Sequence, residues 1–233
     1  MSSARRSRIF ALSVLAGLIA GGILAALQVA VVRPYMNSLV EGIIDELLAD
    51  GEFDEELFDS QARSVYLMHT AGSAVMGLAA GALIGGVSAL AKSKAGIGDA
   101  MLIAGIGWFV LYAVPTAKYP PSPIAMFSEE AAAQYYPLYF SYLALSGLAA
   151  LGVTAAFRKV SKRNRLFGMA AAYLVIVAIA YAVFPPYELD STFDQPLLNS
   201  WRALVSAAMT AFWFSAGVIA GLLWKYGSTE KKQ

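Results

Sequence analysis

The feature that most constrains this chain is an uninterrupted apolar run near its beginning. Residues 9–32 contain no charged side chain over 24 positions. A helix needs about 20 apolar residues to cross the hydrocarbon core of a bilayer. The apolar region of a cleaved secretory signal has only about 7–15 residues, so this run is interpreted as a retained spanning helix. The same length argument weighs against reading Arg5-Arg6 as a twin-arginine export signal.

Five further apolar blocks follow the first one. The whole chain is 58% hydrophobic and 14% charged, whereas an average soluble domain is about 25% charged. The blocks predict an all-α fold, a polytopic membrane helical bundle that forms one integral-membrane domain over residues 1–233 of a multi-pass plasma-membrane protein. The six expected spans are about 9–32, 65–90, 100–117, 136–157, 167–184 and 201–224.

The basic residues are distributed unequally between the two sides of such a bundle. Of the 17 Lys and Arg residues, 13 fall at the N-terminus, in the loops near 91–99 and 158–166, and in the C-terminal tail. Because loops rich in Lys and Arg stay in the cytoplasm, both termini are expected there. The outer side holds the remaining four, which are Arg33, Arg63, Lys118 and Arg202.

The acidic outer loop, residues 35–64, is the only long polar connection between the expected spans. Arg33-Pro34 is expected to end the first helix, because proline disrupts helical hydrogen bonding. Apolar residues between Leu39 and Leu48 repeat at helical spacing, which predicts a short amphipathic helix that ends near Gly51. The acidic residues form either a solvated surface or a field that raises the local concentration of cations.

The second expected span carries small residues at four-residue spacing, and these are Ser73, Gly77, Gly81 and Gly85. Small residues on one face of a membrane helix allow another helix to approach closely. This face is therefore expected to pack against a helical partner.

Several polar residues in or near the spans are candidates for an ion pathway. The only histidine, His69, lies about one turn inside the second span, beside Met68. A neutral imidazole suits divalent cobalt, nickel, zinc or copper, and a thioether favours softer ions. His69 is therefore either a metal ligand or a histidine that hydrogen-bonds to a neighbouring helix. Gln28 fits either a polar interior or an interhelical hydrogen bond, and Arg63 and Arg202 either line a pathway or snorkel to the headgroups.

Several catalytic signatures are missing from the sequence. It contains no cysteine, no Walker loop, no His-Glu-x-x-His and no Gly-x-Ser-x-Gly. The expected spans contain no carboxylate, which proton-driven transporters usually place there. The chain is therefore not expected to be an enzyme or to hold a resident cofactor, and a net charge of +1 gives no bulk attraction to nucleic acid.

A rigid stretch, Lys118-Tyr119-Pro120-Pro121-Ser122-Pro123, follows the third span. Each proline fixes its own φ and restricts the preceding residue, which predicts a stiff external loop. We expect the Lys118→Ala substitution to disturb cargo handling or partner docking more than membrane insertion. The third span ends Tyr112-Ala113-Val114-Pro115, and the fifth ends on the similar stretch from Tyr181 to Tyr187. This similarity indicates either an internal repeat or two ordinary helix stops.

The residues from Pro115 to Pro123 resemble the Pro-x-x-Lys-Tyr-Pro-x-x-Pro signature of CbtA-type proteins, which are regarded as the large subunit of a predicted cobalt transporter. Gln28 before Arg33-Pro34, and Arg63 and Arg202 at the starts of their spans, agree with the resemblance. The matching motif positions are Lys118, Tyr119, Pro120, Pro121 and Pro123. The resemblance implies Co²⁺ as the transported ion and a small single-span CbtB-type partner that bears histidines.

Two functions are open from the sequence. The resemblance, the acidic outer loop and His69 favour a subunit of a divalent-metal uptake system. The absence of intramembrane carboxylates and the small-residue helix faces favour an accessory subunit that packs within a larger membrane complex without transporting anything.

Overall fold

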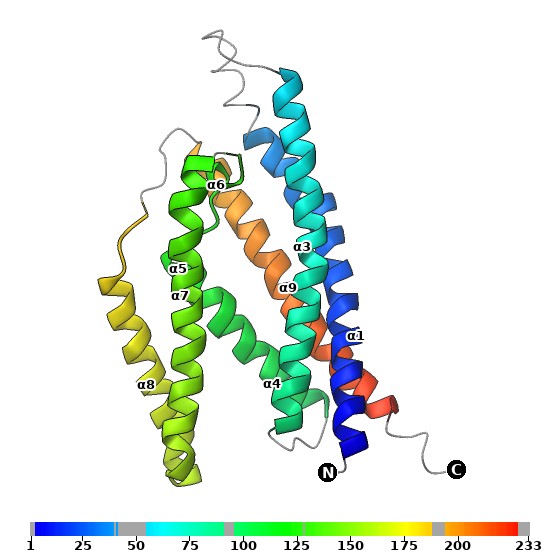
Figure 1. Cartoon of the computed structure of the whole chain (residues 1–233), viewed down its shortest axis with the longest axis vertical. Coiled ribbons are helices and arrows are strands. Elements are labelled where there is room, and N and C mark those ends of the chain that lie inside the picture. Colours follow the sequence, from blue (N-terminus) through cyan, green and yellow to red (C-terminus); the bar gives the residue numbers. More distant parts are fainter. Residues whose placement is uncertain are drawn as a thin grey trace. The chain divides into compact units, whose positions relative to one another are not determined.

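The computed structural model describes residues 3–39, 41, 55–90, 96–127, 129–187 and 194–227, and these residues contain no β-strand. Six helices are long and apolar enough to cross a membrane, which confirms the predicted helical fold and its six spans (Figure 1). The membrane-capable helices are Ser3–Leu39, Tyr66–Leu90, Ile97–Lys118, Glu129–Lys159, Asn164–Val183 and Gln195–Gly227. The individual elements are α1 (Ser3–Leu27), η1 (Gln28–Val32), α3 (Glu55–Leu90), α4 (Ile97–Trp108), η2 (Phe109–Ala113), α5 (Val114–Lys118), α6 (Ile124–Phe127), α7 (Glu129–Ala156), η3 (Phe157–Lys159), α8 (Lys162–Val183) and α9 (Gln195–Gly227).

The first helix does not end at Arg33-Pro34, and that prediction is wrong. The helix continues to Leu39 through η1, a π-helical turn. There the backbone N–H of Arg33 donates to the carbonyl of Gln28, five residues back instead of four. The wider turn accommodates Pro34, which has no N–H to contribute, without breaking the helix.

The expected acidic loop is also shorter than predicted. Within the predicted loop 35–64, residues 35–39, 41 and 55–64 are helical. Most of the expected amphipathic helix, together with Gly51, lies outside the described residues.

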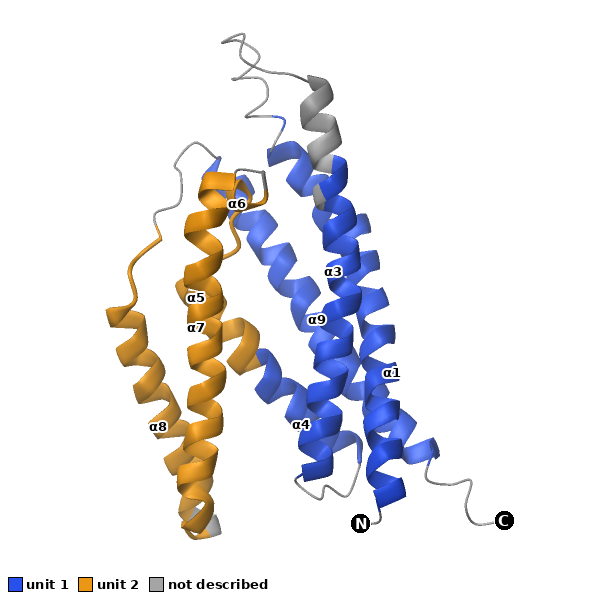
Figure 2. Ribbon diagram, viewed as in Figure 1, with its two compact units in different colours: residues 1–108, 191–233 blue, residues 109–190 orange. Residues whose placement is uncertain are grey.

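The chain divides into two compact units (Figure 2). Unit 1 comprises residues 1–108 and 191–233, and unit 2 comprises residues 109–190. In unit 1, α1 packs against α3 and α9, and α4 packs against α9. In unit 2, α7 packs against α5, α6 and α8 around a core rich in tyrosine.

The α1–α3 seam is the closest helix contact in unit 1. A Cβ atom added to Gly17 would lie 2.0 Å from the carbonyl oxygen of Gly77, and one added to Gly21 would lie 2.6 Å from that of Ser73. A Cβ on Gly81 would likewise lie 2.4 Å from the carbonyl oxygen of Ser13. The predicted packing role of the small-residue face is therefore confirmed, and its partner is α1 of the same chain.

The C-terminal part of α9 is hydrogen-bonded to the N-terminal part of α1. The indole Nε1 of Trp224 donates to the carbonyl oxygen of Ile9 at 3.3 Å and to Ser13 Oγ at 3.1 Å. A Cβ on Gly227 would lie 2.9 Å from Leu12 Cδ1. The N-terminus of α1 and the C-terminus of α9 therefore lie at the same end of unit 1 (Figure 1).

We predict that Gly17→Ala separates α1 from α3, because its Cβ has no room beside the Gly77 carbonyl. Forcing an extra methyl group into a packed contact typically costs about 1–3 kcal/mol. The matched control is Gly22→Ala, because nothing lies within 4 Å of its added Cβ and alanine favours helix. Thermal unfolding in detergent should show a lower Tm for Gly17→Ala only. Equal Tm values for the two variants would contradict the packing.

Candidate functional site

The proline motif begins inside a helical run in which the hydrogen-bond register changes. The run passes from α4 through η2, a π-helical segment, into α5. In π-helical register the carbonyl of Val110 would accept from residue 115, but Pro115 has no N–H. The hydroxyl of Ser146 donates to the Val110 carbonyl instead, at 2.5 Å, and lies 2.7 Å from the Tyr173 hydroxyl.

The motif itself is a packed bend between α5 and α6. Tyr119 has φ −124° and ψ 83°, an extended conformation of the kind expected before a proline. The side chains of Tyr119, Ser122 and Pro123 are buried, and Pro120 and Pro121 are half-buried. The prolines therefore lie in a segment whose side chains pack into unit 2.

Lys118 binds the C-terminal end of α8. Its Nζ donates to the carbonyl oxygen of Tyr181 at 2.8 Å and lies 4.5 Å from the centre of the Tyr181 ring. In a continuing α-helix this carbonyl would accept from residue 185, which is Pro185 and has no N–H. The helix ends at Val183, so the Tyr181 carbonyl has no such donor, and the ammonium group of Lys118 donates to it instead.

Tyr119 makes the next link between the two segments. Its hydroxyl donates to the carbonyl oxygen of Pro185 at 2.8 Å, and its own carbonyl accepts from the Tyr135 hydroxyl at 3.2 Å. The Tyr119 ring meets that of Tyr142 edge to face, with 5.8 Å between the ring centres. Burial raises the pKa of the Tyr119 phenol, which keeps it protonated as a donor at neutral pH.

The other candidate residues belong to unit 1, whereas the proline motif belongs to unit 2. Gln28 is half-buried in η1, and Arg202 is half-buried on α9. On α3, His69 is half-buried, Arg63 is exposed and Met68 is 70% exposed. The described residues include no group of three or more His, Cys, Asp or Glu side chains that could hold a metal ion.

Sequence reasoning missed a cluster around η1. The Arg33 guanidinium lies 4.1 Å from the centre of the Tyr66 ring, and the Tyr66 hydroxyl donates to Asn37 Oδ1. Arg33 and Tyr66 are 33 positions apart, so no local pattern pairs them. The sequence signal that could have paired Arg33 with Tyr66 is the match between the small residues of α1 and α3. It pairs these two residues only if the first helix is continued beyond Pro34.

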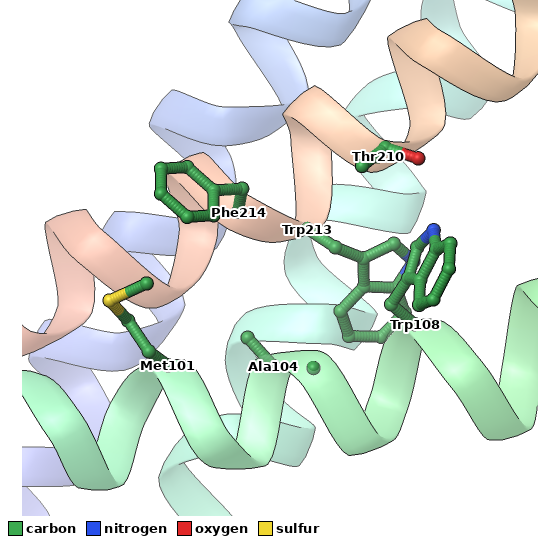
Figure 3. A pocket seen from close by; sticks show the side chains of 7 residues that line it. Met101, Ala104, Trp108, Thr210, Trp213 and Phe214 are labelled. Carbon is green, nitrogen blue, oxygen red and sulfur yellow. The ribbon is translucent and has the colours of Figure 1, made fainter.

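Unit 1 also contains an apolar pocket of about 150 Å³ between α4 and α9 (Figure 3). It is lined by Met101, Ala104, Gly105, Trp108, Thr210, Trp213 and Phe214. The lining carries no charged side chain, and the hydroxyl of Thr210 already donates to the carbonyl of Ser206 at 2.8 Å. The pocket therefore offers space for an apolar group and no ligands suited to a metal cation.

Six membrane-capable helices define a multi-pass membrane protein. A family model described as "Probable cobalt transporter subunit (CbtA)" matches residues 6–225, nearly the whole chain. The chain belongs to the CbtA family, which confirms the resemblance noted from the proline motif. No curated protein and no solved structure matches the chain.

We predict that Ser146→Ala destabilises unit 2, because Val110 and Tyr173 both lose a buried partner. Leaving a buried polar group unsatisfied costs about 1–3 kcal/mol. The matched control is Ser200→Ala, since the exposed Ser200 hydroxyl donates only to the carbonyl of Pro196 in its own helix, at 2.9 Å. Tm measurements in detergent should show a loss for Ser146→Ala alone, and a comparable loss in both variants would refute the assignment.

Tyr119→Phe should give a pH-dependent loss of stability. The Tyr119 phenol has a raised pKa in the folded chain, against about 10 when unfolded. The contribution of this phenol to the free energy of unfolding is therefore fully present below about pH 10. It is lost as the pH rises through the pKa of the folded chain. The Tm difference between the native chain and Tyr119→Phe should narrow above about pH 10. The exposed Tyr226, changed to Phe, is the control, and a pH-independent difference for Tyr119→Phe would contradict the prediction.

Proposed function

We propose that this chain carries Co²⁺, or a closely related divalent transition-metal ion, into the cell as the membrane-embedded subunit of a transport system. The match to the CbtA family over residues 6–225 carries this proposal, because the family is described as a probable transporter subunit. A subunit requires a partner, and we propose a small single-span CbtB-type protein. The positive-inside rule supports a plasma-membrane orientation with both termini in the cytoplasm.

The proposed binding place for the ion lies beside the α1–α3 seam, beyond the stretch where the glycines of the two helices meet. Gly21 of α1 approaches both Ser73 and Gly77 of α3. Gln28 lies two turns further along the same run, level with Tyr66 of α3 and about one turn from the level of His69. Both side chains are half-buried, and no hydrogen bond among the described residues uses the His69 imidazole or the Gln28 amide. Two potential ligands therefore lie within about one helical turn of each other along the seam.

The backbone of η1 adds oxygen ligands at the same level. Pro34 has no N–H to offer the carbonyls of Val29 and Ala30, which precede it by five and four residues. An imidazole nitrogen with amide and carbonyl oxygens is a ligand set that divalent cobalt accepts. Such a site holds an ion weakly, and conduction requires an ion to leave its site as well as enter it. Met68 is omitted from this site, because it is exposed on the adjacent position of α3.

An accessory role without transport is the alternative function. The described residues include no cluster of three or more acidic, histidine or cysteine side chains, and Lys118 and Tyr119 contact their own chain. In that case the chain would assemble with stoichiometric membrane partners and would not move metal by itself.

We predict that cells lacking other cobalt uptake accumulate Co²⁺ when they express this chain together with its partner. Within that system, His69→Gln should lower uptake about tenfold or more, because imidazole is the strongest ligand at the seam. The neighbouring substitution Met68→Leu is the matched control and should leave uptake unchanged.

Uptake is measured as cell-associated cobalt per molecule of chain in the membrane. Absence of uptake by the native chain with its partner would refute the transport proposal and favour the accessory role. Full uptake by His69→Gln would refute only this binding place for the ion.

A further inference from the structure

The C-terminal end of α8 lacks hydrogen-bond donors. The last four carbonyls of any helix have no partner within the helix. Here the N–H of Phe184 donates to the carbonyl of Ala180 at 2.9 Å, which satisfies the first of them. The next two residues, Pro185 and Pro186, have no N–H, so neither can donate to the carbonyls of Tyr181 and Ala182 four positions earlier. The helix dipole adds partial negative charge at this end.

One cationic group of the chain lies at this helix end. The Nζ of Lys118 is 2.8 Å from the carbonyl oxygen of Tyr181 and 4.5 Å from the centre of the Tyr181 ring. The ring of Tyr119 is also near, at 5.9 Å from its centre to Nζ. A carbonyl oxygen and an aromatic face are the two groups that bind an alkylammonium ion, by hydrogen bonding and by cation–π attraction.

We propose that the end of α8 is a binding site for a primary ammonium ion, and that Lys118 is its tethered occupant. The lysine acts as a positioning residue, since it joins the last turn of α5 to the last turn of α8. This site does not depend on the proposed cobalt transport, and its chemistry predicts what can replace the lysine. A free primary alkylammonium ion has the same charge and the same N–H donors as the lysine side chain, and it can occupy the vacated position.

The test is chemical rescue of Lys118→Ala, with the full chain purified in detergent. Loss of a charge-assisted hydrogen bond should lower its Tm on the order of 5 °C. Raising ethylammonium chloride in steps to about 1 M should progressively restore that loss, relative to the native chain in the same salt. Tetramethylammonium chloride supplies the same ionic strength and charge without N–H donors and should restore clearly less of the loss. Lys159→Ala is the matched control, because Lys159 is exposed on η3.

The outcomes separate the proposal from a merely structural lysine. An unchanged Tm in Lys118→Ala, or a loss that ethylammonium and tetramethylammonium restore equally or not at all, would overturn it. Two further variants cover the case in which Lys118→Ala does not accumulate. Lys118→Met keeps the aliphatic part of the side chain without the ammonium group, and Lys118→Arg keeps a positive charge and N–H donors. Both should accumulate, with a lower Tm for Lys118→Met than for Lys118→Arg, and equal Tm values for the two variants would overturn the proposal.

Discussion

Every backbone polar group inside a bilayer must find its partner within the protein, and proline removes a donor each time it occurs in a span. Three prolines, two within spans and one just after a span, show how the chain responds to it. Near Pro34 the helix widens into a π-turn. Beside Pro115, the hydroxyl of Ser146 donates to the carbonyl of Val110. At Pro185, the amine of Lys118 donates to the carbonyl of Tyr181. In unit 2, Ser146 and Lys118 therefore each donate to a carbonyl that cannot accept from a following proline.

The recognisable motif of the sequence is distinct from the groups proposed to bind the ion. The proline motif marks the chain as a member of the CbtA family, yet Lys118 and Tyr119 contact carbonyls of their own chain. A motif of this kind specifies how α5 and α8 fit together. The groups best suited to a transition-metal ion, the imidazole of His69 and the oxygens of η1, lie in the other compact unit. The family signature and the proposed ion-binding place are thus different parts of the molecule.

Charge-free apolar runs were sufficient to predict six spans, because the thickness of a bilayer fixes how long such runs must be. The same reasoning placed a helix end at Pro34, because it gave proline its usual effect and could not anticipate a π-turn. Lys118 was recognised as important, but its partner Tyr181 is 63 positions away and comes close only after folding. The sequence therefore indicated that Lys118 belongs to the motif, but it did not indicate which residue Lys118 contacts. The proline four positions after Tyr181 was the available clue.

The α1–α3 seam has a mechanical consequence. Because a Cβ at Gly17 would lie only 2.0 Å from the Gly77 carbonyl, the two backbones are in direct contact and interlock. Helices joined so closely cannot slide or rotate past one another without first separating. Any opening and closing of this protein must therefore carry α1 and α3 together as one rigid body. The hinges of such a movement have to lie outside the stretch where the glycines meet.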